Sequence, residues 1–294
     1  MHPVLDDLIT LLQLERIEDN IFRGESRDIG SAQVFGGQVL GQALSAAQHT
    51  VDNRVVHSLH AYFLRRGDME APIVYEVDRA RDGGSFSSRR VVAIQHGRPI
   101  LNLAASFQTP EPGLEHQASM PEVPGPDDCD DILEVQSELV QKMPQAMRRH
   151  MADKRAFEIR PVVQQRQPGV VNKNVWIKTV DALPDSHTLH RNLLAYASDY
   201  ELLGAATLAH DLDFVDDGLI MASLDHALWF HRELRIDEWL LYSIDSPNAS
   251  GARGFARGQF FNQAGELLAS TAQEGLMRVV DNPNSKRSDP KLQG

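Results

Sequence analysis

Three polar side chains in the last third of the sequence could together activate a water molecule. Asp199 lies in a helix-like stretch, and Ser223 and Gln273 lie in strand-like stretches whose neighbours are mostly apolar or small. A hydroxyl and an amide can each donate and accept hydrogen bonds, so this pair could orient a water. A carboxylate could then take the proton from that water. These residue types therefore indicate hydrolysis by general-base catalysis.

Two of these residues also have other interpretations. Asp199 could be the N-cap of a helix, a frequent role for aspartate, or a buried base whose proton affinity is raised by desolvation. Ser223 could be a nucleophile with His226 as its base, but residues three apart on one strand point to opposite faces. The local sequence leaves the choice for Asp199 open.

The sequence contains two copies of one module. Residues 62–65 match residues 229–232, and after the next turn the offset grows by one, so that residues 100–107 match residues 268–275. The residues of the first copy that correspond to the three polar groups are Val56 for Ser223, Ala105 for Gln273 and, in the best match of the helices, Gln38 for Asp199. We therefore expect one catalytic site per chain, in the second copy.

Both copies predict a helix followed by an antiparallel meander, which is an α+β plan. In the first copy we expect helices at residues 3–14 and from Gly36-Gly37 to residue 47, and strands at residues 73–79, 88–95 and 100–107. In the second copy we expect a helix near residues 191–206 and strands at residues 219–229, 239–245, 255–262 and 267–277. The Pro- and Asp-rich stretch at residues 109–135 is typical of a linker, and we expect a helix at residues 134–154 after it.

Composition and charge limit the class of protein. The 294 residues are 42% hydrophobic and 24% charged, the balance of a soluble globular protein with room for roughly two domains. No apolar run approaches the roughly 18 residues of a membrane span, and the first residues lack the basic region of a secretory signal, so we expect a cytosolic protein. The net charge of −12 argues against nucleic acid or an anionic membrane as a partner.

Several familiar catalytic motifs are missing from the sequence. It has no Gly-x-Ser-x-Gly elbow, no phosphate-binding loop, no His-Glu-x-x-His and no Gly-x-Gly-x-x-Gly. His187 and His190 have a spacing that could suit a metal, but no neighbour completes a ligand set, and we interpret them as surface residues in a polar turn. We expect neither a metal nor a cofactor.

Five strings resemble the acyl-CoA thioesterase II family, and the resemblance runs from about Leu12 to Arg278. The strings are residues 34–43, 57–65, 222–232, 252–255 and 273–275. The resemblance implies a double hot dog fold, with two antiparallel sheets each wrapped around a long central helix. It also implies hydrolysis of fatty acyl-CoA to free acid and CoA by a water bound among an aspartate, a threonine or serine, and a glutamine. Carried over by position, these residues are Asp199, Ser223 and Gln273, although many members have threonine in place of this serine.

Further residues are candidates for substrate contacts. We expect Gly36, Gly37, His57 and Arg253 to contact the substrate, and we interpret Asp225 and His226 as a structural pair. The arginines that flank the repeated turns and could meet the CoA phosphates are Arg65, Arg89, Arg90, Arg253 and Arg257. A helix N-terminus, at Gly36-Gly37 or near Asp199, could supply oxyanion donors.

The predicted organisation has four parts. Residues 1–108 form the first hot dog module, residues 109–158 the linker and connecting helix, residues 159–280 the catalytic module, and residues 281–294 a polar tail. The expected partner is an acyl-CoA substrate, and we expect a homo-oligomer, a dimer or a tetramer. Two alternatives are an acyl-thioester hydratase or dehydratase, because one fold supports several chemistries, and a non-catalytic acyl-CoA-binding protein.

Overall fold

The computed structural model describes residues 1–27, 33–135, 155–163, 171–210 and 218–280. The elements of the first half are α1 (Pro3–Leu12), β1 (Glu15–Glu18), β2 (Ile21–Gly24), α2 (Gly36–Gln48), β3 (Val55–Phe63), β4 (Ile73–Asp82), β5 (Phe86–Gln95) and β6 (Arg98–Gln108). Those of the second half are η1 (Pro126–Asp128), α3 (Ile132–Val135), β7 (Phe157–Pro161), β8 (Asn172–Thr179), α6 (His187–Ala197), η2 (Leu203–Thr207), β9 (Leu219–Ser223), β10 (Asp225–Phe230), β11 (Leu240–Ser250), β12 (Arg253–Asn262) and β13 (Leu267–Val279). The expected α+β plan is confirmed.

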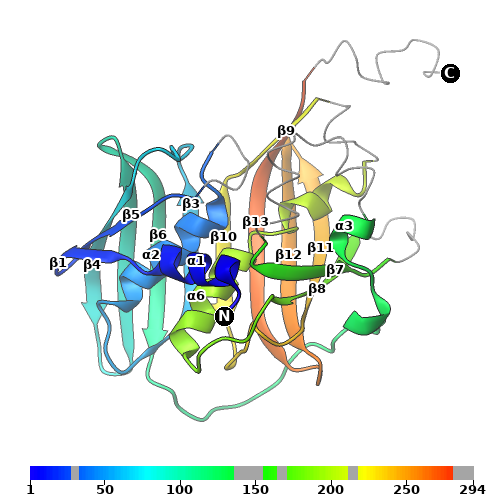
Figure 1. Cartoon of the computed structure of the whole chain (residues 1–294), viewed down its shortest axis with the longest axis horizontal. Coiled ribbons are helices and arrows are strands. Elements are labelled where there is room, and N and C mark those ends of the chain that lie inside the picture. Colours follow the sequence, from blue (N-terminus) through cyan, green and yellow to red (C-terminus); the bar gives the residue numbers. More distant parts are fainter. Residues whose placement is uncertain (28–32, 136–154, 164–170, 211–217, 281–294) are drawn as a thin grey trace.

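The two modules join edge to edge in one antiparallel sheet. Its described strands follow the order β1-β2-β4-β5-β6-β3-β10-β13-β12-β11-β8-β7, and β9 also pairs with β13. The join is the pairing of β3 with β10, near the middle of Figure 1. Helices α1, α2 and α6 lie together in front of this sheet in the same view. Each module therefore contributes half of the sheet and one long helix.

Strand pairing repeats between the halves, as the sequence offsets predict. His60 of β3 pairs with Ala104 of β6, and their counterparts Ala227 of β10 and Ala272 of β13 pair in the same way. The register shifts by one residue at His57 in the first half. It shifts again at Leu224, the counterpart of His57, where β9 ends before β10 begins. The single strand predicted for residues 219–229 is therefore two strands separated by a bulge.

Helix α2 is almost wholly buried between the sheet and α6. Its apolar residues include Leu40, Ala43 and Leu44, which have no exposed surface, and small residues fill the rest of the helix. The contacts of α2 with β3, β4, β5 and β6 on one side and with α6 and α1 on the other explain why the helix carries so little charge. The predicted buried helix beginning at Gly36 is confirmed.

The helix predicted for residues 191–206 is wrong at both ends. Helix α6 begins at His187, where the Ser186 side chain accepts a hydrogen bond from the Leu189 N–H, and it ends at Ala197. A turn follows, in which Glu201 has a positive φ of 64°, and then η2. The expected helix at residues 134–154 lies mostly outside the described residues, as does the tail. The strands that were not predicted are β1, β2, β3, β7 and β8.

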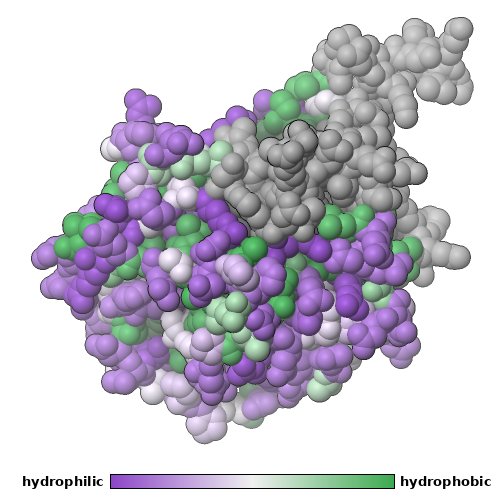
Figure 2. Space-filling view, viewed as in Figure 1, coloured by the Kyte–Doolittle hydropathy of each residue, from purple (hydrophilic) through white to green (hydrophobic). Residues whose placement is uncertain are grey.

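The surface agrees with the charged composition. The face in Figure 2 is mainly hydrophilic, with hydrophobic residues scattered over it. Within the described ranges, none of the helices has both the length and the apolar character to cross a bilayer.

Candidate active site

Asp199 lies two residues beyond the end of α6, against the beginning of α2. Its Oδ1 accepts a hydrogen bond from Nε2 of Gln273 at 2.8 Å, and its carboxylate also accepts one from the backbone N–H of Gly37. Burial raises the pKa of Asp199, while these two donors oppose the rise because they stabilise the ionised form. Asp199 is therefore not a helix N-cap, and it has the environment of a general base.

The first turn of α2 comes this close because it begins with two glycines. A Cβ on Gly36 would lie 2.7 Å from Oδ2 of Asp199, and a Cβ on Gly37 would collide with the backbone carbonyl of Tyr196. Phe35 is the N-cap of α2 and provides no capping side chain, so the positive end of the helix faces the carboxylate, and the Gly37 N–H donates to it. Of the two helix termini considered from the sequence, the one that begins at Gly36 lies at the site.

Gln273 lies on β13 and has no exposed surface. Its Nε2 is committed to Asp199, but among the described residues its Oε1 has no hydrogen-bond partner. Buried amide oxygens nearly always have a partner. Beside a carboxylate that can accept a proton, this free acceptor suits the O–H of a bound water.

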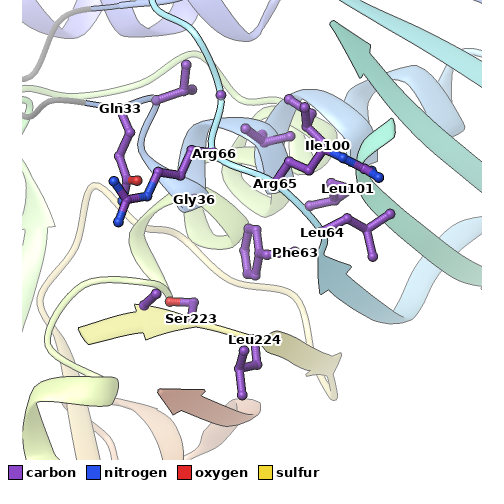
Figure 3. A pocket seen from close by; sticks show the side chains of 14 residues that line it. Gln33, Gly36, Phe63, Leu64, Arg65, Arg66, Ile100, Leu101, Ser223 and Leu224 are labelled. Carbon is purple, nitrogen blue, oxygen red and sulfur yellow. The ribbon is translucent and has the colours of Figure 1, made fainter. Parts of the chain in front are cut away.

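Ser223 ends β9 and pairs with Gly275, two residues after Gln273 on β13. It lines a cleft of about 260 Å³, together with Gly36 and Phe63. Figure 3 shows Ser223 and Leu224 on one side of this cleft and Gly36 on the other. The structure thus brings Asp199 and Gln273 into direct contact, behind Gly36. Ser223 lies on the cleft side and makes no described hydrogen bond to either of them.

The alternative base for Ser223 is occupied elsewhere. Nε2 of His226 lies 2.9 Å from the hydroxyl of Ser198, and burial lowers the pKa of His226 to about 3. Asp225 accepts a hydrogen bond from the backbone N–H of Glu274 at 2.7 Å. Each residue therefore binds its own neighbour, so the predicted structural role is reasonable but the two do not form a pair with each other.

The candidate substrate contacts separate into two groups. Gly36 lines the cleft, and so do Arg65 and Arg66, whose side chains appear in Figure 3. By contrast, His57 contacts the Ser106 hydroxyl at 2.8 Å and does not line the cleft, and Arg253 is paired with Glu274 at 2.9 Å. Arg66 was missed in the sequence, where its position directly after Arg65 and the matched string was the available signal.

The same place in the first module is filled by a buried arginine. Thr50 lies two residues beyond the end of α2, as Asp199 does beyond α6, so Thr50 and not Gln38 is the structural counterpart of Asp199. Arg89, the neighbour of Ala105 across β5 and β6, donates from Nε to the Thr50 hydroxyl at 2.8 Å. Arg89 is 2% exposed, which also removes it from the candidates for CoA phosphates.

The two spaced histidines do not match their predicted setting. His187 is exposed in the first turn of α6, but His190 is buried and its Nδ1 accepts the backbone N–H of Ile236. The prediction of a pair in a polar surface turn is therefore wrong for His190. Across the described part of the chain, no group of three or more His, Cys, Asp or Glu residues is arranged to hold a metal ion.

The fold and the site together define a duplicated helix-and-sheet protein with a potential general base near a cleft. Comparison with protein-family models matches an acyl-CoA thioesterase N-terminal domain at residues 23–108 and an acyl-CoA thioesterase model at residues 146–276. The chain is 44% identical to acyl-CoA thioesterase 2 of Haemophilus influenzae over 96% of its own length and 100% of that protein. It is 40% identical to human acyl-coenzyme A thioesterase 8, over 92% of this chain and 88% of that protein.

Solved structures agree with the sequence matches. An acyl-CoA thioesterase II from Mycobacterium marinum superposes with a TM-score of 0.79 at 42% identity, over 93% of this chain and 99% of the other. A hot dog protein from Alicyclobacillus acidocaldarius superposes with a TM-score of 0.75 at 18% identity, over 94% and 99%, and shows the fold alone. The chain belongs to the acyl-CoA thioesterase family. The double hot dog fold and the thioesterase class expected from the sequence are confirmed.

Proposed function

We propose that the chain hydrolyses fatty acyl-CoA to a free fatty acid and CoA, with Asp199 as general base and Ser223 and Gln273 as ligands of the attacking water. The observation that carries this proposal is the contact between Asp199 and Gln273. Nε2 of Gln273 donates a hydrogen bond to the Asp199 carboxylate, and its Oε1 is an acceptor without a described partner. This arrangement can bind a water and remove its proton.

In the proposed reaction, Asp199 takes one proton from the water as its oxygen attacks the thioester carbonyl. The negative charge on the carbonyl oxygen of the tetrahedral intermediate would be stabilised by the positive end of the α2 dipole, which begins at Gly36 beside the cleft. The C–S bond then breaks, the acid leaves with the water oxygen, and the CoA sulfur takes the proton. Ser223, on the cleft side of Gly36, would hold the water or the carbonyl oxygen by its hydroxyl.

The cleft lining supports a substrate that is apolar at one end and anionic at the other. Val39, Phe63 and Leu101 provide apolar surface inside the cleft, and the exposed Arg65 and Arg66 lie at its border. Because the protein carries a net charge of −12, a local pair of cations is needed to attract CoA phosphates. We therefore infer that Arg65 and Arg66 bind the phosphates of CoA. A cytosolic location and a homo-oligomeric state stay predictions.

Release of free thiol from an acyl-CoA, followed with a chromogenic thiol reagent, tests the reaction. We expect a stoichiometric release of CoA and fatty acid. A hydratase would change the acyl chain and release no thiol, and a binding protein would leave the acyl-CoA intact. A profile across acyl lengths would then show which chains the cleft accepts.

A further inference from the structure

A second cleft lies in the first module, at the position equivalent to that of the active-site cleft. It has a volume of about 480 Å³, and Val56 and Phe107 line it. These two residues pair across β3 and β6 as their counterparts Ser223 and Gly275 pair across β9 and β13. The first turn of α6 borders the second cleft, just as the first turn of α2 borders the active-site cleft. The duplication has therefore left two clefts, and the proposed hydrolysis uses one of them.

Arg191 lines the second cleft with an incompletely satisfied positive charge. Its side chain is 7% exposed, and its buried Nε has no hydrogen-bond partner among the described residues. The carboxylate that acts on it electrostatically is Glu233, which is itself mostly exposed and lies 3.7 Å from His187. Burial of a charge without hydrogen bonds costs free energy unless another group compensates. An anion that enters the cleft would provide this compensation.

The other charged groups of the second cleft already have partners. Arg54 donates to the backbone carbonyls of Gly83 and Gly84 and to a serine hydroxyl. The carboxylate of Asp185 is paired with Arg235 at 3.1 Å. Arg191 is thus the buried cation in this lining whose Nε lacks a described acceptor, and it lies one helical turn from the N-terminus of α6.

The helix terminus adds to the attraction of Arg191 for an anion. The Ser186 side chain caps the N–H of Leu189 at 3.4 Å, whereas the N–H groups of His187 and Thr188 belong to the first turn, where an α-helix provides no carbonyl partner. The helix dipole makes this end positive. Both cation and dipole therefore favour a compact anionic group.

Apart from Gln48 and His49, the remaining lining is apolar, which indicates the rest of the ligand. Val51, Val55, Val56 and Phe107 border the same cleft, and its volume lies within the range of small-molecule sites. We propose that the second cleft is a non-catalytic binding site for a fatty acid, whose carboxylate pairs with Arg191 and whose chain contacts the valines and Phe107. An acyl-CoA has a neutral thioester in place of that carboxylate, so an acyl chain bound here in the same position would bring no charge to Arg191. This binding goes beyond the proposed hydrolysis and does not depend on it.

Titration calorimetry with octanoate, without any thioester present, tests the proposal. We compare the wild type with Arg191→Met, which removes the charge but keeps an unbranched apolar stem, and with Arg191→Lys, which keeps the charge. We expect Arg191→Met to weaken one octanoate site by at least about tenfold, and Arg191→Lys to retain it, because a charge-assisted contact is lost in the first and kept in the second. Acetate, which lacks the chain, and octanol, which lacks the charge, should bind this site at least about tenfold more weakly.

A second variant keeps the test decisive if Arg191→Met does not fold. Thr188 is exposed in the first turn of α6, so Thr188→Glu should fold and should place a competing carboxylate at the mouth of the cleft. We expect Thr188→Glu to weaken octanoate binding as well. Octanoate binding unchanged in both variants would overturn the proposal. Acetate binding as tight as octanoate binding would also overturn it, because the site would then be one for small anions.

Discussion

At the scale of single residues, the protonation of Asp199 depends on opposing effects. Burial raises its pKa, and hydrogen bonds from Gln273 and from the Gly37 N–H lower it. Asp199 must be ionised to accept a proton, so kcat should fall as the pH drops through its folded-state pKa. Since that pKa is raised, the loss should occur above the range near 4 that is usual for an exposed aspartate.

Gln273→Ala tests the link between the amide and this protonation. The variant removes a donor that stabilises ionised Asp199, so the pKa of Asp199 should rise further and the acid limb of the kcat profile should move to higher pH. At the pH optimum, kcat should fall more than KM rises, because an oriented water matters mainly in the transition state. Gln259→Ala, on the neighbouring β12, is the control. An acid limb that stays in place would show that Gln273 does not tune the base.

Ser223 offers a choice between two chemical roles. We expect Ser223→Thr to stay active, because the hydroxyl is kept, and Ser223→Ala to be impaired in kcat. A fully active Ser223→Ala would remove the hydroxyl from the mechanism. An acyl group covalently bound to Ser223, seen by mass spectrometry after a substrate quench, would instead establish a nucleophile, for which the structure offers no base at His226.

At the scale of elements, the close approach of α2 to the end of α6 sets the geometry of the base. Gly36→Ala would place a methyl group 2.7 Å from Oδ2 of Asp199, so the carboxylate would have to move. We expect kcat to fall by about tenfold or more, with a small change in Tm, since a misplaced catalytic group loses rate steeply. Gly204→Ala is a matched control, because a Cβ there meets nothing within 4 Å. Equal activity of both variants would contradict the role of this contact.

Most regular elements could be predicted from periodicity, and the errors have physical causes. The alternation in β4, β5 and β6 follows their burial on one face, so these strands were recognisable. The end of α6 was not, because apolar residues continue into η2 and conceal the turn at Glu201. The break at Leu224 was also hidden, since a bulge arises from pairing with distant strands and leaves no local sign.

In the whole molecule, duplication produced one site with the proposed catalytic groups and one without them. In the first module the three counterparts are Thr50, Val56 and Ala105, and Arg89 fills the space beside them. We therefore expect calorimetric titration of the Asp199→Asn protein with a non-hydrolysable acyl-CoA analogue to give about one bound molecule per chain. Two equivalent acyl-CoA sites would contradict this asymmetry.

The sequence places Ser223 and Gln273 in the second half alone, because the constant offsets align them with Val56 and Ala105 of the first copy. That the second half carries the chemistry stays a prediction. The sequence could not predict the counterpart of Asp199, because the two helices differ in length and the sequence does not show where each helix ends. Nor could it predict that Arg89 fills the place of Gln273, since Arg89 reaches Thr50 from a neighbouring strand.

The turnover of Asp199→Asn tests whether this carboxylate is the general base. Asparagine keeps the shape and can still accept the hydrogen bond from Gln273, but it cannot act as the base. We expect kcat to fall by at least about a hundredfold, within the range of roughly 10² to 10⁴ for loss of a general base. The Tm at neutral pH should not fall, because the raised pKa of Asp199 means that its ionised form is disfavoured in the folded state. A folded Asp199→Asn protein with near-normal kcat would contradict the assignment of Asp199 as the base.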